Sequence, residues 1–126
     1  MLTNAVSIPS PDKEAVLGKA TVRAAKELDL SNAALARVIG FSEPTIGRIV
    51  GGRRGIDPQS KEGQLALLLI RVFRSLDPLV GSDARKRSDW LTSYNKSLNG
   101  HPNALIETPQ GLVSTLAYLD GMRAVI

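Results

Sequence analysis

The fold is decided by residues 31–54, which read SNAALARVIGFSEPTIGRIVGGRR. This stretch predicts two short helices joined by a tight turn. Ser31 or Asn32 suits the N-cap of the first helix and Ser42 that of the second, because their side-chain oxygens accept from the free N–H groups of a first turn. Gly40 ends the first helix, since glycine takes up the left-handed conformation beyond a helix end without steric cost. Such a pair is a helix-turn-helix.

Apolar side chains indicate that this pair packs onto a preceding helix. Ala36 lies four residues before Gly40, where a small side chain allows the second helix to cross closely. The apolar contacts are expected from Leu35, Ile39, Phe41, Ile46 and Ile49. The preceding helix is predicted over residues 12–28, where apolar positions recur at helical spacing.

The second helix of the pair has an outward face that suits the major groove of DNA. The side chains expected to turn inward are Ile46, Ile49 and Val50. Thr45 and Arg48 then share the outward face, with Glu43 ahead of them. Arg48 can donate to guanine N7 and O6, and Glu43 can accept from a cytosine amino group.

Polar residues on both sides of this helix suit contacts to DNA phosphates. Ser42 either caps the helix or bonds a phosphate, and Arg53 and Arg54 follow on a glycine-flanked loop. The candidate DNA-binding residues are therefore Ser42, Glu43, Thr45, Arg48, Arg53 and Arg54. Glu43 and Gly47 are unusual on a reading helix, because a carboxylate repels phosphate and glycine weakens a helix. Taken alone, the two short helices are also compatible with a simple packing motif, and Arg53 and Arg54 with a solvent-exposed loop. The helix pair and the basic loop together favour DNA binding.

The rest of the chain also has a helical pattern, which predicts an all-α fold. Helices are predicted over residues 60–76, 82–94 and 108–121, with a loop over 95–103 and a tail over 122–126. Asp77-Pro78 is expected to close the first of these helices, because the residue before proline avoids the helical region. Ser82 and Thr108 are expected to cap the other two. We expect a flexible arm over residues 1–11, a helix-turn-helix domain over 12–59 and a second domain over 60–126.

The long helix over residues 60–76 carries more apolar surface than one core contact needs. Its core stripe is Leu65, Leu68, Leu69, Val72, Phe73 and Leu76. Leu67 and Ile70 extend the apolar surface beyond that stripe. The helix is therefore expected to be central in the fold and also to pack on a second subunit, with Leu67 and Ile70 at the homodimer interface. A dimer also suits an operator with two half-sites about one helical turn apart.

Composition excludes several classes of protein. The 126 residues include no cysteine and one histidine, so a disulfide framework is ruled out and a tetrahedral zinc site is not expected. The longest apolar run, residues 65–70, is far shorter than a membrane span. No secretory signal is evident, so the protein is expected in the cytosol, with no cofactor, bound metal or small-molecule substrate. Sixteen Lys and Arg against twelve Asp and Glu give a mild net charge of +4, which agrees with a polyanionic partner.

An enzyme is the weakest of three functional hypotheses. Asp89 or Asp120 could supply a carboxylate, but the sequence has no nucleophile–base motif. The glycine-rich stretch GGRRG, residues 51–55, lacks the spacing and the lysine of a phosphate-binding loop. We therefore expect no catalytic residue. The second hypothesis is a plain dimeric helix-turn-helix repressor, and the third follows from a family resemblance.

Two patterns in the sequence resemble a known family. Ala36, Gly40, Ile46 and Ile49 fall where phage-repressor-like (Xre-type) regulators have the corresponding residues of their helix-turn-helix. The second half resembles the toxin-binding domain of the Xre/MbcA/ParS antitoxins. The residues that carry this second resemblance are Leu105-Ile106, Thr108-Pro109, Gly111-Leu112, Tyr118-Leu119-Asp120 and Met122-Arg123. They look most like the branch that is paired with RES-domain toxins.

The resemblance implies an antitoxin that blocks the active site of a RES toxin, an enzyme that consumes NAD⁺. It also implies repression of the antitoxin's own operon, usually as a dimer. Residues such as Trp90, Leu112, Leu116 and Leu119 are expected in the core. The toxin-binding candidates are the residues left over, Tyr118, Met122, Arg123, Val125 and Ile126.

Overall fold

The computed structural model describes the backbone of residues 10–125 and the side chains of residues 12–124. Within this part of the chain there are seven helices and no strand, which confirms the all-α prediction there. The helices are α1 (Ser10–Glu27), α2 (Asn32–Ile39), α3 (Glu43–Val50), α4 (Lys61–Val80), α5 (Ala84–Thr92), α6 (Pro102–Leu105) and α7 (Pro109–Val125). None of the described helices is both long and apolar enough to cross a membrane.

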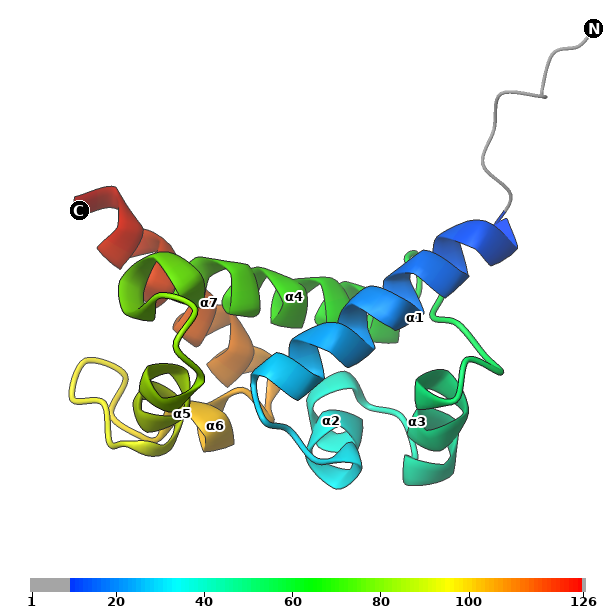
Figure 1. Cartoon of the computed structure of the whole chain (residues 1–126), viewed down its shortest axis with the longest axis horizontal. Helices are drawn as coiled ribbons and strands as arrows, with labels where there is room; N and C mark the ends of the chain where they lie inside the picture. The colour runs from blue at the N-terminus through cyan, green and yellow to red at the C-terminus, as the bar shows by residue number, and fades with distance from the viewer. Residues whose placement is uncertain (1–9, 126) are drawn as a thin grey trace, which may run out of the picture.

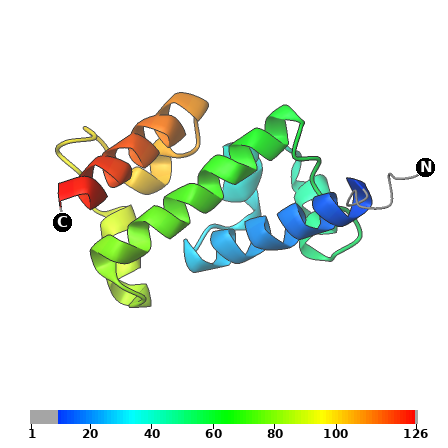
Figure 2. The same ribbon diagram turned by 90° about the horizontal axis from the view of Figure 1, so that it is seen from above.

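Helix α4 is the centre of the molecule. It runs between α1 on one side and α7 on the other, and it packs against both (Figure 2). Helices α2 and α3 lie below α1 and α4, and α5 and α6 lie on that same lower side next to α7 (Figure 1). The helix-turn-helix and the C-terminal helices therefore share one central support.

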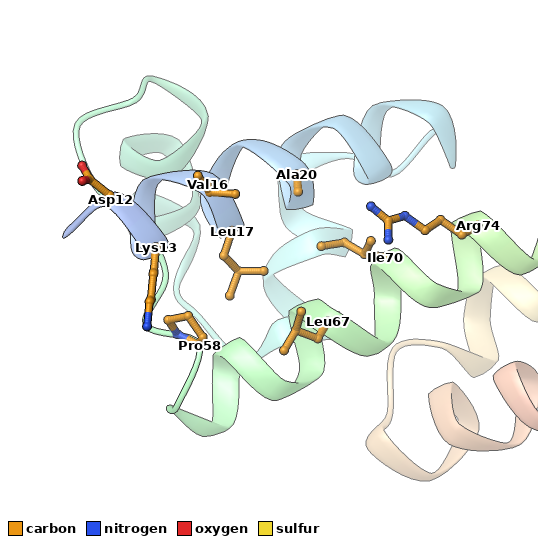
Figure 3. Close-up of a pocket in the computed structure, with 9 residues that line it drawn as sticks. All are labelled: Asp12, Lys13, Val16, Leu17, Ala20, Pro58, Leu67, Ile70 and Arg74. Atoms are coloured by element: carbon orange, nitrogen blue, oxygen red, sulfur yellow. The ribbon is translucent and has the colours of Figure 1, made fainter. Parts of the chain in front are cut away.

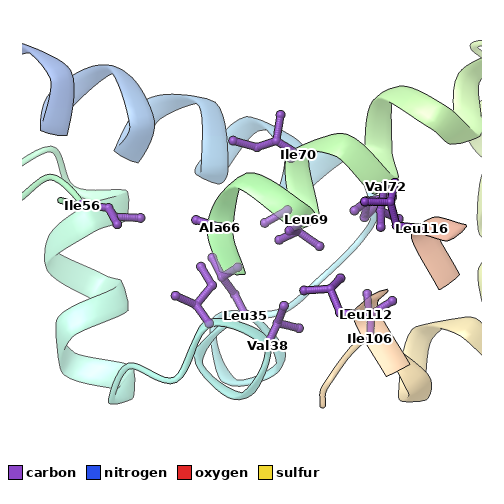
Figure 4. Close-up of a cluster of buried hydrophobic side chains, with 14 of the residues drawn as sticks. Leu35, Val38, Ile56, Ala66, Leu69, Ile70, Val72, Ile106, Leu112 and Leu116 are labelled. Carbon is purple, nitrogen blue, oxygen red and sulfur yellow. The ribbon is translucent and has the colours of Figure 1, made fainter. Parts of the chain in front are cut away.

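One hydrophobic core joins the two halves of the chain (Figure 4). Leu69, Val72 and Leu76 of α4 have no exposed surface. Around them pack side chains from α2, from the loop before α4, from the residue that follows α6, and from α7, namely Leu35, Val38, Ile56, Ile106, Leu112 and Leu116. Because α4 is covered on several sides, most of its wide apolar surface is buried within the protomer.

The capping signals of the helix-turn-helix are confirmed. Ser31 Oγ accepts from the Ala34 N–H at 3.1 Å, and Ser42 Oγ accepts from the Thr45 N–H at 3.3 Å. Gly40 has φ of +94°, and its N–H donates to the Ala36 carbonyl, so α2 ends in the left-handed conformation that glycine favours. These local hydrogen bonds fix where both helices of the motif begin and where the first one ends.

Two helices run past the predicted stops. Helix α4 continues through Pro78 to Val80, because a proline in the last turn removes only one helical hydrogen bond and the core holds the rest of the helix. Helix α7 continues past Gly121 to Val125, since one glycine weakens a helix by only about 1 kcal/mol. The predicted tail is therefore helical as far as Val125, and Ile126 lies outside the described residues.

The remaining boundaries differ by a few residues. Helix α5 is capped by Asp83 rather than by Ser82. The Oδ1 atom of Asp83 accepts from the Arg85 N–H at 2.9 Å. Helix α6, only four residues long, lies partly within the predicted loop and was not foreseen. Helix α1 begins at Ser10, inside the predicted arm, and residues 1–9 of that arm lie outside the described part of the chain.

Candidate functional site

The outward face of α3 differs from the prediction at two positions. Glu43 and Arg48 are exposed as expected, but Thr45 is only 8% exposed and Val50 is 44% exposed. The buried face is formed by Thr45 together with Ile46 and Ile49, so it begins one residue earlier than the apolar pattern suggests. Val50 is the last residue of a short helix and lies beyond that buried face. Thr45 therefore does not point outward, which corrects the prediction.

Thr45 instead organises the polar groups at the start of α3. Its Oγ1 accepts from the Ser42 hydroxyl at 3.0 Å and from Arg48 Nη2 at 3.2 Å. Ser42 also caps the helix, which confirms one of its two predicted roles, and its contact to a phosphate stays a prediction. The bond to Thr45 draws the Arg48 guanidinium toward the N-terminal end of α3 and leaves its other donors available. That end of a recognition helix is the part that reaches base edges.

The basic loop after α3 lies next to the turn of the motif. Arg53 and Arg54 are both exposed, and the Arg53 N–H donates to the Arg48 carbonyl at 2.9 Å. The Arg54 guanidinium carbon is 4.9 Å from the ring centre of Phe41, a half-buried residue in the turn between α2 and α3. This cation–π contact holds Arg54 near the motif. The sequence pattern had assigned Phe41 to apolar packing alone.

Arg37 on α2 is a cation that the sequence reading missed. Its Nε donates to Glu107 Oε1 at 2.6 Å and its Nη2 to Glu107 Oε2 at 3.3 Å, so the two side chains form a two-bond pair. This hydrogen bond and the charge of Glu107 raise the pKa of Arg37, and Glu43 adds to the effect. The sequence did offer a signal, because Arg37 is the one charged residue of α2.

The C-terminal candidates lie along α7. Tyr118 and Met122 are half-buried, and Arg123 is exposed in the last turn. Tyr118 was expected to have nothing to pack against, but its ring stacks on Trp90 of α5, with centres 6.5 Å apart and planes 21° apart. Trp90 is itself only half-buried, so it is less enclosed than predicted. The side chain of Val125 and all of Ile126 lie outside the described residues.

A turn beside Trp90 presents a further aromatic side chain. Tyr94 is 54% exposed, and its ring meets His101 edge-on at 5.6 Å between centres. The Tyr94 hydroxyl donates to Asn99 Oδ1 at 2.5 Å, and His101 Nδ1 lies 3.0 Å from the Thr92 carbonyl. Trp90 and Tyr94 line a shallow pocket next to α5. This turn belongs to the stretch that the sequence predicts as a loop, residues 95–103.

Comparison with known families covers both halves of the chain. Residues 7–71 match the antitoxin Xre-like helix-turn-helix domain, and residues 75–124 match the antitoxin Xre/MbcA/ParS C-terminal toxin-binding domain. The chain belongs to the Xre/MbcA/ParS antitoxin family. No curated protein matches it. The antitoxin thus has a DNA-binding domain and a toxin-binding domain, and it is not an enzyme.

The family match decides among the three functional hypotheses. A toxin-binding domain implies a cognate toxin, so the plain repressor without a toxin partner is set aside. The structure also shows what surrounds Asp120 and Asp89, the two carboxylates considered for catalysis. Asp120 accepts from the Ser75 hydroxyl at 2.9 Å and lies 3.6 Å from Arg71, which ties α7 to α4. Asp89 is exposed on α5.

A buried arginine connects the two domains of the antitoxin. Arg87 of α5 is 5% exposed, and its Nε donates to the Glu27 carbonyl at the end of α1 at 2.7 Å. Its Nη2 lies 3.3 Å from Glu27 Oε2 and its Nη1 lies 3.7 Å from Asp77 Oδ1. The guanidinium also lies over Phe73 of α4. Arg87 thereby satisfies a carbonyl that the end of α1 leaves without a helical partner.

The two residues predicted at a dimer interface line an apolar groove between α1 and α4 (Figure 3). Leu67 is 43% exposed, whereas Ile70 is 7% exposed and belongs mostly to the core of the protomer. Val16 of α1, expected to face the core, is 67% exposed on the rim of this groove. The helices that line most of this groove, α1 and α4, lie on the opposite side of the antitoxin from α2 and α3 (Figure 1).

Proposed function

We propose that this antitoxin neutralises a RES-domain toxin that degrades NAD⁺, by covering the active site of that enzyme. The proposal rests on the run from Leu105 to Leu112 and on the late Tyr118–Arg123 segment, which resemble the RES-paired branch. The observation that carries it is the half-exposed surface of Trp90, Tyr118 and Met122, with the Arg123 cation beside it. Aromatic anchors of this kind dominate protein interfaces. Arg123 can meet a carboxylate or occupy the place of a substrate phosphate.

We propose in addition that the antitoxin represses its own promoter through α3. Arg48 reads a base edge, Glu43 lies beside it, and Arg53 and Arg54 bind phosphates. Ser42 and Thr45 act through Arg48, because the hydrogen bonds from Ser42 and Arg48 to Thr45 hold the guanidinium at the helix start. Thr45 is thus a positioning residue in this proposal.

The third part of the proposal is a homodimer. Leu67 and Val16 are large apolar side chains exposed in the α1–α4 groove, which the nearly buried Leu17 and Ile70 also line. A dimer formed on that side leaves both α3 helices uncovered, since α2 and α3 lie on the other side (Figure 1).

Co-expression with the enzyme encoded by the adjacent reading frame tests the toxin proposal. That enzyme alone should stop growth and deplete NAD⁺, and the antitoxin should restore both. Deleting residues 123–126, or replacing Tyr118 by Ala, should abolish protection. Val113→Ala is the matched control, because Val113 is a 52% exposed apolar residue of the same helix that does not belong to the proposed surface.

Promoter binding should be measured on the same preparations. The truncated protein should fold and bind DNA as the full chain does, since the DNA contacts come from α3 and the loop after it. Full protection by the truncated protein would place the blocking surface elsewhere in the C-terminal half. A neighbouring protein that is harmless on its own, or that is toxic without consuming NAD⁺, would refute the RES assignment.

A further inference from the structure

The pair between Arg37 and Glu107 joins the two domains at the surface. Arg37 belongs to α2 of the helix-turn-helix, and Glu107 lies between α6 and α7 of the toxin-binding domain. Both nitrogen–oxygen bonds run between the guanidinium fork and the two carboxylate oxygens. A phosphate group presents the same pattern of two charged oxygens to an arginine fork. Glu107 therefore engages the arginine fork in a two-bond geometry that a phosphate group can also adopt.

The position of Arg37 suits such a contact. Helices α2 and α3 lie on the same side of the molecule, away from the α1–α4 groove (Figure 1). Arg37 lies in the last turn of α2, which leads through residues 40–42 to the start of α3 at Glu43. Arg53 and Arg54 follow the other end of α3. Cations thus flank both ends of the recognition helix, as phosphate contacts on both sides of a groove require.

The pair is exposed enough to exchange partners. The Arg37 side chain is 58% exposed and that of Glu107 is 27% exposed. Surface ion pairs of this kind contribute little to folding, because water solvates both charges when they separate. A DNA phosphate, by contrast, also brings the release of condensed counterions.

We infer that Arg37 is a DNA phosphate contact and that Glu107 is its competitor within the same chain. This inference rests on DNA binding through α3, and it adds a residue outside α3 and its loop. In the free antitoxin Glu107 holds Arg37. On DNA the guanidinium exchanges the carboxylate for a phosphate, so Glu107 lowers the affinity for any DNA sequence.

Binding of the full chain to two duplexes tests this inference. One duplex covers the region upstream of the antitoxin's own gene and the other has that sequence scrambled. Arg37→Ala should weaken binding to both by about three- to tenfold and flatten the salt dependence by about one unit of slope. Glu107→Gln should tighten binding to both by about two- to fivefold, because it removes the competitor. In the Arg37→Ala background, Glu107→Gln should have no effect.

Matched variants separate this exchange from a general effect of charge. Arg85→Ala and Asp89→Asn make the same charge changes on the exposed face of α5, outside the proposed dimer groove, and should leave both affinities unchanged. If Glu107→Gln tightens binding equally with and without Arg37, repulsion of DNA explains the effect and the inference is wrong. If Arg53→Ala and Arg54→Ala weaken binding but Arg37→Ala does not, this inference fails while the α3 proposal stands. A wild-type chain that binds neither duplex overturns both.

Discussion

At the scale of single residues, Arg48 should carry sequence recognition. Arg48→Ala is expected to cost about 1–3 kcal/mol on the operator and to relax discrimination at one base pair, because a two-bond contact to guanine is lost. Arg53→Ala and Arg54→Ala should instead weaken all sequences alike. Titration of labelled operator and scrambled duplexes at several salt concentrations distinguishes the two behaviours. Unchanged operator affinity in Arg48→Ala would refute the recognition role of α3.

Thr45→Val extends this test to the positioning group. The substitution keeps the shape of a buried side chain but removes the oxygen that accepts from Arg48 at 3.2 Å. Operator affinity should fall in the wild-type background and stay the same in the Arg48→Ala background, as measured by a double-mutant cycle. A loss that is equal in both backgrounds would mean that Thr45 acts without Arg48.

Arg87 gives a prediction about stability. Arg87→Ala removes a donor from the Glu27 carbonyl and a charge from two carboxylates, and it is expected to lower the free energy of unfolding by about 1–3 kcal/mol. The loss is limited because the Glu27 and Asp77 side chains are 40% and 47% exposed, although the Asp77 Oδ1 atom that faces Arg87 is itself buried. Urea unfolding measures it. Arg85→Ala, on the exposed side of the same helix, should change the free energy by less than about 0.5 kcal/mol.

Individual residues also show which features of the structure can be predicted from the sequence and which cannot. Cap residues such as Ser31, Ser42 and Gly40 were predictable, because their hydrogen bonds and dihedral angles are local. The burial of Thr45 was not, since it depends on how α3 rotates against its neighbours. Nor was the pairing of Arg37 with Glu107, whose partners are 70 residues apart. Long-range polar contacts leave no periodic trace in the sequence.

At the scale of the helices, the exposed edge of α4 should control self-association. Leu67→Glu is expected to convert the proposed dimer into a monomer, because a charge would be buried on the apolar α1–α4 side. Sedimentation at micromolar concentration measures the change. Val113→Glu, which places the same charge on an exposed apolar position of α7, should leave the dimer intact. A wild-type monomer at that concentration would contradict the dimer.

Helix ends were predictable only where a side chain or a backbone angle marks them. The start of α7 at Thr108-Pro109 is such a case, with the Gly111 N–H donating to Thr108 Oγ1 at 3.0 Å. Pro78 and Gly121 were read as stops, yet tertiary packing carries the helices past both. Helix α6 is too short to give a pattern of its own.

At the scale of the whole molecule, the antitoxin should unfold in one transition. The core is continuous from α2 through α4 to α7, and Arg87 ties α5 to the end of α1. Heating followed by circular dichroism and by Trp90 fluorescence, which reports on the toxin-binding domain, should give the same midpoint. Two separate midpoints would show that the domains melt independently.

The continuity of α4 limits how this family can recombine. The two family matches end at residue 71 and begin at residue 75, and both positions lie inside α4 (Lys61–Val80). A chimaera joined there would place the junction inside one helix that packs against both α1 and α7. A working exchange of toxin specificity between relatives would have to carry α4 along with the C-terminal half, joined in the loop of residues 57–60. Each new combination of a DNA-binding and a toxin-binding domain then needs changes in α1 and α2 that fit the incoming α4.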